Sequence, residues 1–266
     1  MTAPLEELAR SLVDLSQPTQ RFGIYVLPNT DPAAELGRAV EREVFAEFFG
    51  NSPELLAAEY APYEPATVFL CVVDHHNLRP AGSSRMLLPS ACGLKSLDDI
   101  DNVWGENSDA VIARSEPNFD RSRCVDVATL AVGADYRGAE TSGLISITLY
   151  MAMVMTAYAV GAPWLAAVMD IPVLDAISER MADPFTRFSG LEPKSYLDSP
   201  ASVPVFVDFM GWRPRLHERD SASHDILYRG TGLETAVWTP DWDLVTQHAL
   251  ETLGLHSAAA LPRVAV

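Results

Sequence analysis

The apolar positions of the chain follow two patterns that alternate along its length. Short runs rich in β-branched and aromatic residues predict strands, and longer stretches with apolar residues three or four positions apart predict helices. The helix expected after Pro32, for example, places Leu36, Val40 and Val44 on one side. Strands are predicted at residues 22–27, 67–74, 82–88, 125–132, 164–170 and 202–209, with a weaker one at 226–229.

Helices are expected where a start signal precedes a stretch of helical spacing. They are predicted over residues 4–16, from Pro32 to Gly50, from Ser52, from Ser96 to Trp104, from Leu144 to Val160, from Asp170 to Ala182 and from Thr239 to Gly254. Ser96 and Asp99 resemble a capping box at the start of their helix. Residues 105–123 are polar and are predicted to form a long loop, and Arg213 to Arg219 would give a basic edge if extended.

The order of these elements predicts one mixed α/β sheet with helices around it. A single domain over residues 1–266 is expected, because no internal repeat or low-complexity linker divides the chain. Residues 1–20 are predicted to form an N-terminal helical extension. The alanine-rich residues 255–266 are predicted to be a flexible tail.

The central segment, residues 124–160, joins a buried strand to a glycine-bearing turn and a long apolar helix. Such a unit aims free backbone N–H groups and the positive end of the helix dipole at one point, which suits a phosphate group. Many strand–turn–helix units bind nothing, so a purely structural unit remains an alternative. The strand contains one acid, Asp126, in an otherwise apolar run.

The end of this strand and its turn carry a more specific pattern. Leu130, Val132, Tyr136, Arg137 and Gly138 resemble the Leu-x-Val-x-x-x-Tyr-Arg-Gly segment of the GNAT acyltransferase superfamily. The resemblance implies an α/β (α+β) fold with a mixed, mostly antiparallel central sheet flanked by helices. It also implies that the strand holds the pantetheine arm of an acyl-CoA or acyl-phosphopantetheine co-substrate and that the turn holds its pyrophosphate.

The resemblance implies a co-substrate site made by Leu130, Ala131, Val132, Arg137, Gly138, Ser142 and Gly143. The turn departs from the family pattern at one position, where Glu140 replaces the middle glycine of Arg-Gly-x-Gly. A carboxylate at this place would repel a diphosphate.

Three further segments resemble the acyl-homoserine-lactone synthase branch, the autoinducer synthases, in order and spacing. They are residues 42–45, residues 59–64 and residues 84–89. The resemblance implies an acceptor pocket that includes Arg42, Phe45, Glu64 and Arg85, although Phe45 also lies on a predicted core stripe. Ala61 replaces the first aspartate of that branch, the acid of its central strand is shortened to Asp126, and the arginine of that strand is gone. An acceptor other than S-adenosylmethionine is therefore expected.

Composition narrows the possible partners of the protein. A formal net charge of −17 excludes a typical nucleic-acid-binding surface and argues mildly against an acidic acyl carrier protein as donor, which remains possible if a local basic patch exists. Three cysteines without metal-type spacing predict neither disulfides nor a metal site. No signal peptide is recognisable and the apolar run from Leu144 is too short and polar for a membrane span, so a cytoplasmic protein is expected.

Acyl transfer to an amine needs a base, a donor for the oxyanion and an acid for the leaving thiolate. Asp126 is the candidate base, because burial would raise its pKa. Its alternative is a structural acid paired with Arg85 or Arg123. Backbone N–H groups near Leu130 would stabilise the oxyanion. No tyrosine falls in residues 171–180, where the resemblance places the acid, so the acid is not assigned.

These observations predict an N-acyltransferase that moves an acyl group directly from an acyl-CoA or acyl carrier protein thioester to the amine of a small molecule. The family context points to secondary metabolism or signalling. The alternative is a non-catalytic GNAT-like module that binds a ligand or a partner protein. Glu140 and the missing tyrosine favour this alternative.

Overall fold

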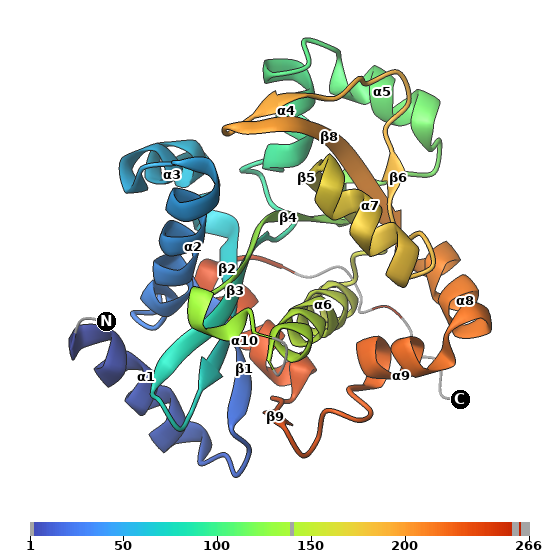
Figure 1. Ribbon diagram of the computed structural model, residues 1–266. Helices are drawn as coiled ribbons and strands as arrows, with labels where there is room; N and C mark the ends of the chain where they lie inside the picture. The colour runs from blue at the N-terminus through green and yellow to red at the C-terminus, as the bar shows by residue number, and fades with distance from the viewer. Residues whose placement is uncertain (1–2, 139–140, 257–260, 262–266) are drawn as a thin grey trace.

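The structure of the protein is a computed structural model that describes residues 3–138, 141–256 and 261 (Figure 1). Within these residues one twisted sheet runs through the molecule in the order β6-β8-β5-β4-β3-β2-β1-β9, with β7 beside β8. Its strands are β1 Phe22–Pro28, β2 Thr67–Asp74, β3 Arg79–Leu87, β4 Cys124–Val132, β5 Trp164–Asp170, β6 Thr186–Arg187, β7 Lys194–Tyr196, β8 Ser199–Asp208 and β9 Val237–Trp238. Only the β1–β9 and β4–β5 pairs are parallel. This mostly antiparallel mixed α/β sheet confirms the predicted fold class.

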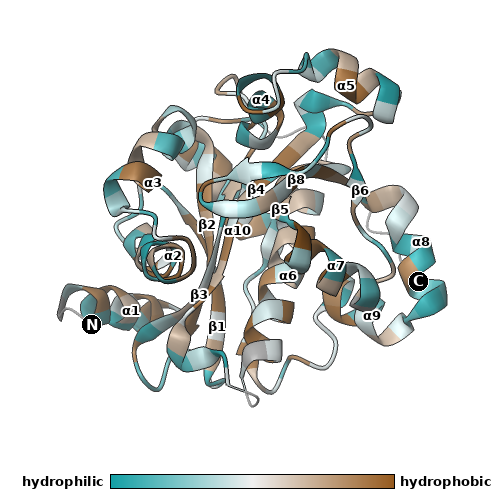
Figure 2. Ribbon diagram, turned by 45° about the horizontal axis from the view of Figure 1, so that its top comes forward, coloured by the Kyte–Doolittle hydropathy of each residue, from teal (hydrophilic) through white to brown (hydrophobic). Residues whose placement is uncertain are grey.

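Helices cover both faces of the sheet. They are α1 Ala3–Ser16, α2 Ala34–Phe49, α3 Pro53–Tyr60, α4 Lys95–Asn102, α5 Ser108–Ser115, α6 Ser142–Ala159, α7 Ile171–Arg180, α8 Phe209–Arg219, α9 Ser221–Arg229 and α10 Trp242–Leu253, with short 3-10 turns η1 Ala61–Ala66, η2 Arg121–Arg123 and η3 Ala134–Tyr136. α1 to α5 pack on one face, and α6 to α10 pack on the other. The apolar strands lie between these two layers (Figure 2).

The alternation of side chains across each strand explains why both faces are apolar. In β2, Phe69 and Cys71 pack under α1 and α2, while Leu70 and Val72 pack against α6 and α10. All eight residues of β2 are buried, as expected for a strand covered on both faces. α6 is buried along most of its length. Among the described residues, no helix is long and apolar enough to span a lipid bilayer.

Three local predictions were wrong. Residues 105–123 contain α5, which begins after Asn107, whose side chain accepts a hydrogen bond from Ala110 N. The basic segment from Arg213 belongs to the helix α8 rather than to a strand, and the weak strand predicted at 226–229 is the end of α9. In α8 the apolar residues Phe209, Trp212 and Leu216 are buried at helical spacing. Burial of that stripe outweighs the two-residue alternation of the basic side chains.

The sheet is divided near its centre by the way β4 pairs with its neighbours. β4 and β5 are paired only over Cys124–Asp126 and Trp164–Ala166. On the other side of β4, the register with β3 shifts so that Ala128 is left without a partner between Val127 and Thr129. An extra residue of this kind bends a strand and increases its twist. β4 therefore turns away from β5 beyond Asp126. The assignment of the chain to one domain with a terminal extension and tail stays a prediction.

Candidate active site

A cavity of about 200 Å³ lies where β4 and β5 part. Val127 to Leu130 of β4 form one wall and Ala167 to Asp170 of β5 form the other. Phe45 and Phe49 of α2 line it from one face of the sheet, and Tyr150 and Met153 of α6 from the other. β7 and the start of β8 complete the lining with Tyr196, Leu197, Ser199 and Ser202. The cavity is therefore largely apolar, with a few polar groups at one end.

A second apolar cavity, of about 50 Å³, adjoins the first. The two share five lining residues, which are Tyr150, Met153, Leu165, Ile177 and Phe185. Beyond them the second cavity reaches Val207, Trp212 and Leu227 under α8 and α9. Apolar space thus continues from the opening between the strands into the helical layer of α6 to α9.

The turn after β4 lies next to the C-terminal half of α2. Arg137 donates from Nε to Val132 O at 2.8 Å, and its Nη1 contacts both carboxylate oxygens of Glu47 at 2.9 and 2.8 Å. The guanidinium also lies over the ring of Phe48. Its second terminal nitrogen, Nη2, is buried and donates no hydrogen bond to any residue that the structure describes. Arg137 therefore retains one donor for a further acceptor.

Carboxylates surround this turn. Ala134 N donates to Glu43 Oε1 at 3.3 Å, and Asp135 pairs with Arg79 at 2.7 Å. Gly138 is exposed, and Gly143 lies in the first turn of α6 together with Ser142. Glu140, the departure from the family pattern, lies outside the described residues. In the described part of this turn, Arg137 retains a donor, and α2 places two acidic side chains, Glu43 and Glu47, next to it.

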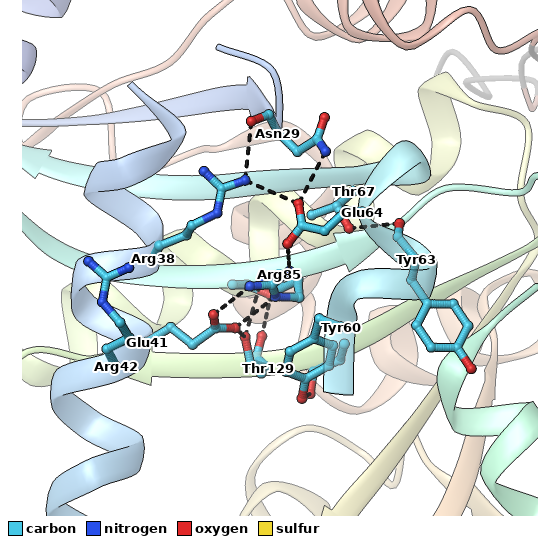
Figure 3. A network of polar contacts seen from close by, with 12 residues as sticks. Asn29, Arg38, Glu41, Arg42, Tyr60, Tyr63, Glu64, Thr67, Arg85 and Thr129 are labelled. Carbon is cyan, nitrogen blue, oxygen red and sulfur yellow. Dashed lines mark hydrogen bonds and ion pairs between the residues drawn. The ribbon is translucent and has the colours of Figure 1, made fainter. Parts of the chain in front are cut away.

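Two of the four predicted acceptor residues meet in a buried ionic network under α2 (Figure 3). Arg85 donates to both oxygens of Glu41 at 2.9 and 2.7 Å, and to Glu64 Oε1 at 2.6 Å. Thr129 Oγ1, on the cavity wall, donates to Glu41 Oε1 at 2.6 Å. Glu64 also accepts from Arg38 and Asn29, each at 3.1 Å. The network therefore links the cavity to the core below α2.

Burial and pairing together determine the charges in this network. Burial alone would lower the pKa of Arg85, but the hydrogen bonds and charges of Glu41 and Glu64 raise it above its ordinary value. Burial alone would raise the pKa of Glu64, and Arg85 holds it below its ordinary value. Arg85 and Glu64 are therefore both ionised at neutral pH. Since Arg38 balances the second carboxylate, the network carries no unmatched charge.

The other two predicted acceptor residues lie apart from this network. Phe45 lines the cavity and contacts Phe49, with the two rings tilted and their centroids 5.5 Å apart. Arg42 forms an ion pair with Glu35 along α2, and Figure 3 draws it beside the network without a bond to it.

Asp126 is fully buried and is the last residue of β4 that pairs with β5 before the two strands part. Its two oxygens accept hydrogen bonds from Ser96 N at 2.6 Å and Ser96 Oγ at 2.7 Å. Ser96 lies in the first turn of α4, so the acid satisfies the free N–H end of that helix. The predicted capping box is wrong, because α4 begins at Lys95 and the side chain of Ser96 bonds Asp126 instead. The predicted partners of Asp126 are also wrong, because Arg85 donates to Glu41 and Glu64 and Arg123 donates to Gly161 O.

The pKa of Asp126 reflects this burial. Burial raises it to about 7, although the hydrogen bonds from Ser96 oppose the shift. Such a pKa suits a general base. The residues that follow Asp126 line the cavity, while its own carboxylate lies against α4. Its role as the base stays a prediction.

Sequence analysis did not identify Glu41, Thr129 or Tyr196. Glu41 falls on the buried side of α2, one position after Val40, and an acid on an apolar stripe is a detectable signal for a buried ion pair. Thr129 was predicted only as part of a strand. Tyr196 lies on the short strand β7, and no local pattern marks it. In the described residues, no group of three or more His, Cys, Asp and Glu side chains is arranged to hold a metal ion.

Comparison with solved structures identifies this architecture. FeeM, an N-acyl amino acid synthase from uncultured soil microbes, matches with a TM-score of 0.56 at 15% identity, over 76% of this chain and 97% of that chain. BjaI, a CoA-dependent acyl-homoserine lactone synthase solved with SAM and isopentyl-CoA, matches with a TM-score of 0.53 at 16% identity, over 86% of this chain and 98% of that chain. The protein has a GNAT-like fold of the autoinducer-synthase type, as the resemblance predicted. Neither protein-family models nor curated proteins give a match.

The ionic network leads to a prediction about stability. Replacing Arg85 by Met leaves Glu41 and Glu64 without their shared cation, and an uncompensated buried charge costs about 3–5 kcal/mol. We expect the free energy of unfolding, measured by urea titration, to fall by this amount. Arg42→Met removes an ion pair on the partly exposed side of the same helix and serves as the control, with an expected loss below about 1 kcal/mol. Equal losses in the two variants would contradict the network.

Asp126 gives a prediction about pH. Its pKa is 3.8 as an ordinary side chain and about 7 in the folded protein, so between these values the unfolded chain releases a proton that the folded chain retains. The Asp126 carboxyl group therefore lowers the free energy of unfolding progressively as the pH rises through this window. We expect Asp126→Asn to remove this fall in stability between pH 4 and pH 7, measured by unfolding at several pH values. The exposed Asp109→Asn is the control, and an unchanged slope in Asp126→Asn would contradict the shift.

Proposed function

We propose that this protein is an N-acyltransferase that moves an acyl group from a pantetheine thioester to the amine of a small molecule. The observation that supports this most is the apolar cavity between the parted strands, next to a turn whose arginine has an unused donor. FeeM and BjaI, which share the fold, are acyl-transferring synthases by name. The donor would be acyl-CoA or an acyl carrier protein.

The parted strands offer what a pantetheine arm requires. Beyond Asp126 and Ala166 the facing edges of β4 and β5 are no longer paired with each other, and backbone groups at such an edge can bond the amides of an extended ligand. The cavity and its apolar extension would then receive the acyl chain. In the reaction the acceptor nitrogen attacks the thioester carbon, the C–N bond forms, the C–S bond breaks and the leaving sulfur takes a proton.

The turn after β4 suits the phosphate part of the donor. Arg137 Nη2 would donate to a phosphate oxygen, and the N-terminal backbone of α6 at Ser142 and Gly143 would add its dipole. A Cβ added to Gly138 or Gly143 would meet no atom of the described residues within 4 Å, so these residues leave room for a ligand to approach the backbone closely. Leu130, Ala131 and Val132 lead from this turn to the thioester. Glu47 competes with the phosphate for Arg137.

The acceptor would bind beside α2. Phe45 lines the cavity directly, while Arg85 and Glu64 act from below by fixing Glu41 and, through it, Thr129. Arg42 is one helical turn closer to the N-terminus of α2 than Phe45 and would contact only an acceptor that extends past the cavity. Because S-adenosylmethionine contacts of the autoinducer synthases are largely missing from the sequence, a different small amine is the proposed acceptor.

A non-catalytic ligand-binding module is the second candidate. It is favoured by the two carboxylates of α2 at the donor turn, Glu43 and Glu47, which weaken any diphosphate contact. It is also favoured by the contact of Asp126 with α4, since a base must reach the attacking amine.

Thiol release tests the proposed function. We expect the wild-type protein to release thiol from acyl-CoA thioesters of two to sixteen carbons in the presence of a panel of small amines. Ala167→Leu narrows the cavity, so kcat/KM for dodecanoyl-CoA should fall at least about tenfold while acetyl-CoA is affected less, since a hydrophobic pocket discriminates by added methylenes. Ligand binding without turnover, seen as a raised Tm, would instead support the binding module. No turnover together with no change in Tm would contradict both.

The donor turn gives a separate prediction. Replacing Glu47 by Gln removes a carboxylate from Arg137 while leaving a side chain of the same shape. We expect the Kd for CoA, measured by calorimetry at low salt, to fall about two- to fivefold, in line with the energy of a partly exposed ion pair. Glu7→Gln on α1 changes the net charge equally and should leave the Kd unchanged. A weaker affinity in Glu47→Gln would argue against phosphate at this turn.

A further inference from the structure

A chain of hydrogen bonds leads from the cavity wall into a second buried polar cluster, made of Glu59, Lys95, Asp99 and Tyr196. Tyr196 Oη donates to Asp99 Oδ2 at 2.6 Å. The same oxygen accepts from Lys95 Nζ at 2.8 Å, and Lys95 Nζ lies 2.9 Å from Glu59 Oε2. Lys95 and Asp99 are buried, whereas Glu59 is about one third exposed.

Tyr196 is the member of this cluster that borders the cavity. It lines the cavity together with Leu197 and Ser199, across from β4. Its ring is held between Trp104, at a centroid distance of 6.0 Å, and the ammonium group of Lys95 at 5.3 Å. These contacts fix the ring, which borders the cavity, and the hydrogen bond to Asp99 fixes the position of its hydroxyl group.

The charges of the cluster keep this hydroxyl group protonated but polarised. Burial raises the pKa of Tyr196 well above its ordinary value, and the nearby Asp99 adds to the shift. Burial alone would lower the pKa of Lys95, but Asp99 and Glu59 outweigh it and the pKa is raised. Lys95 therefore remains a cation and stabilises the carboxylate that receives the tyrosine's hydrogen bond.

We propose that Tyr196 is the catalytic proton carrier of the acyl transfer, with Asp99 and Lys95 as the residues that position it. The inference rests on the proposed function, because it assigns an acid–base group to that reaction. It also supplies the acid that the sequence left unassigned, from a strand outside residues 171–180.

The proposed step is balanced in protons. When the neutral amine attacks the thioester carbon, its nitrogen gives a proton to Tyr196 Oη, and the tyrosine's own proton passes to Asp99 Oδ2. When the C–S bond breaks, Asp99 returns that proton to Tyr196, which gives its proton to the leaving sulfur. The amide and the free thiol are the products, and Tyr196 and Asp99 end as they began. Tyrosinate never forms, which agrees with the raised pKa.

Two ionisable groups next to this cluster, Asp126 and Tyr60, do not offer the same path. Asp126 is held by Ser96. Tyr60 directs its hydroxyl group to Ala128 O, at 3.4 Å, and lies under the guanidinium of Arg85. Among these three tyrosine and aspartate side chains, only Tyr196 lines the cavity.

The test compares two tyrosines whose hydroxyl groups bond carboxylates of the same helix. Tyr196→Phe keeps the ring and removes the proton carrier, so we expect kcat to fall about 100-fold or more, with little change in KM for the thioester. Tyr63→Phe is the matched control, because Tyr63 Oη donates to Asp98 Oδ2 at 3.1 Å away from the cavity lining. It should keep kcat within about twofold of wild type.

Binding of a non-hydrolysable S-alkyl-CoA thioether separates catalysis from packing. We expect Tyr196→Phe to bind the thioether with the wild-type Kd, and Asp99→Asn, whose amide cannot take a proton, to reduce kcat similarly while still binding it. Equal kcat in the two Phe variants, or a lost thioether affinity in Tyr196→Phe that explains its lower rate, would overturn the role of Tyr196. If the wild-type protein turns over no thioester, the proposed function fails first. The variants are then compared by their affinity for the thioether. A lower affinity in Tyr196→Phe would show that Tyr196 has a packing role.

Discussion

The short pairing between β4 and β5 is the constraint on which the rest of the site depends. Three residues of each strand are paired, and the strands then separate because the unpaired Ala128 bends β4 on its other side. A continuous ladder would close the space that now forms the cavity. The split also leaves strand edges inside the protein whose backbone groups need a ligand, side chains or water as hydrogen-bond partners. The apolar lining from α2, α6 and α7 follows from this arrangement.

Two buried polar clusters support the bent strand from one face of the sheet. The Arg85 network holds Thr129 just past the bulge, and the Lys95 cluster lies next to Asp126 just before it. Tyr60 connects the two regions, since its hydroxyl group donates to the carbonyl of Ala128. Buried polar groups are costly unless each finds a partner, and a strand supported in this way has few alternative positions. The bent strand β4 is therefore held in place on the side of the sheet that faces α3 and α4.

The sequence predicted the elements that depend on local patterns. The strands β2 and β3, the central strand and the long helix α6 were predicted from local patterns, and the GNAT-like resemblance added that the sheet is mixed and mostly antiparallel. The misses share a cause, since α5, α8 and α9 are short helices whose burial depends on distant partners. The partners of Asp126 were missed for the same reason. Ser96 is 30 residues away, and no spacing rule identifies a contact that only the tertiary fold creates.

The candidate site was predicted unevenly. The residues of the turn after β4 and the pair Glu64 and Arg85 could be found from motifs, because motifs preserve residue types at fixed separations. The carboxylate Glu47 next to Arg137 could not, since α2 and the turn are 90 residues apart. Tyr196 lies on a three-residue strand that exists only because β8 is beside it.

One arginine shared between two acids also limits how this protein can diverge. Glu41, Glu64 and Arg85 come from a helix, a 3-10 turn and a strand, and Arg38 supplies the second positive charge that the two acids require. An exchange at one position alone leaves a charge stranded in the interior. Homologous chains should therefore vary at these positions together, through a neutral intermediate such as glutamine, or hardly at all.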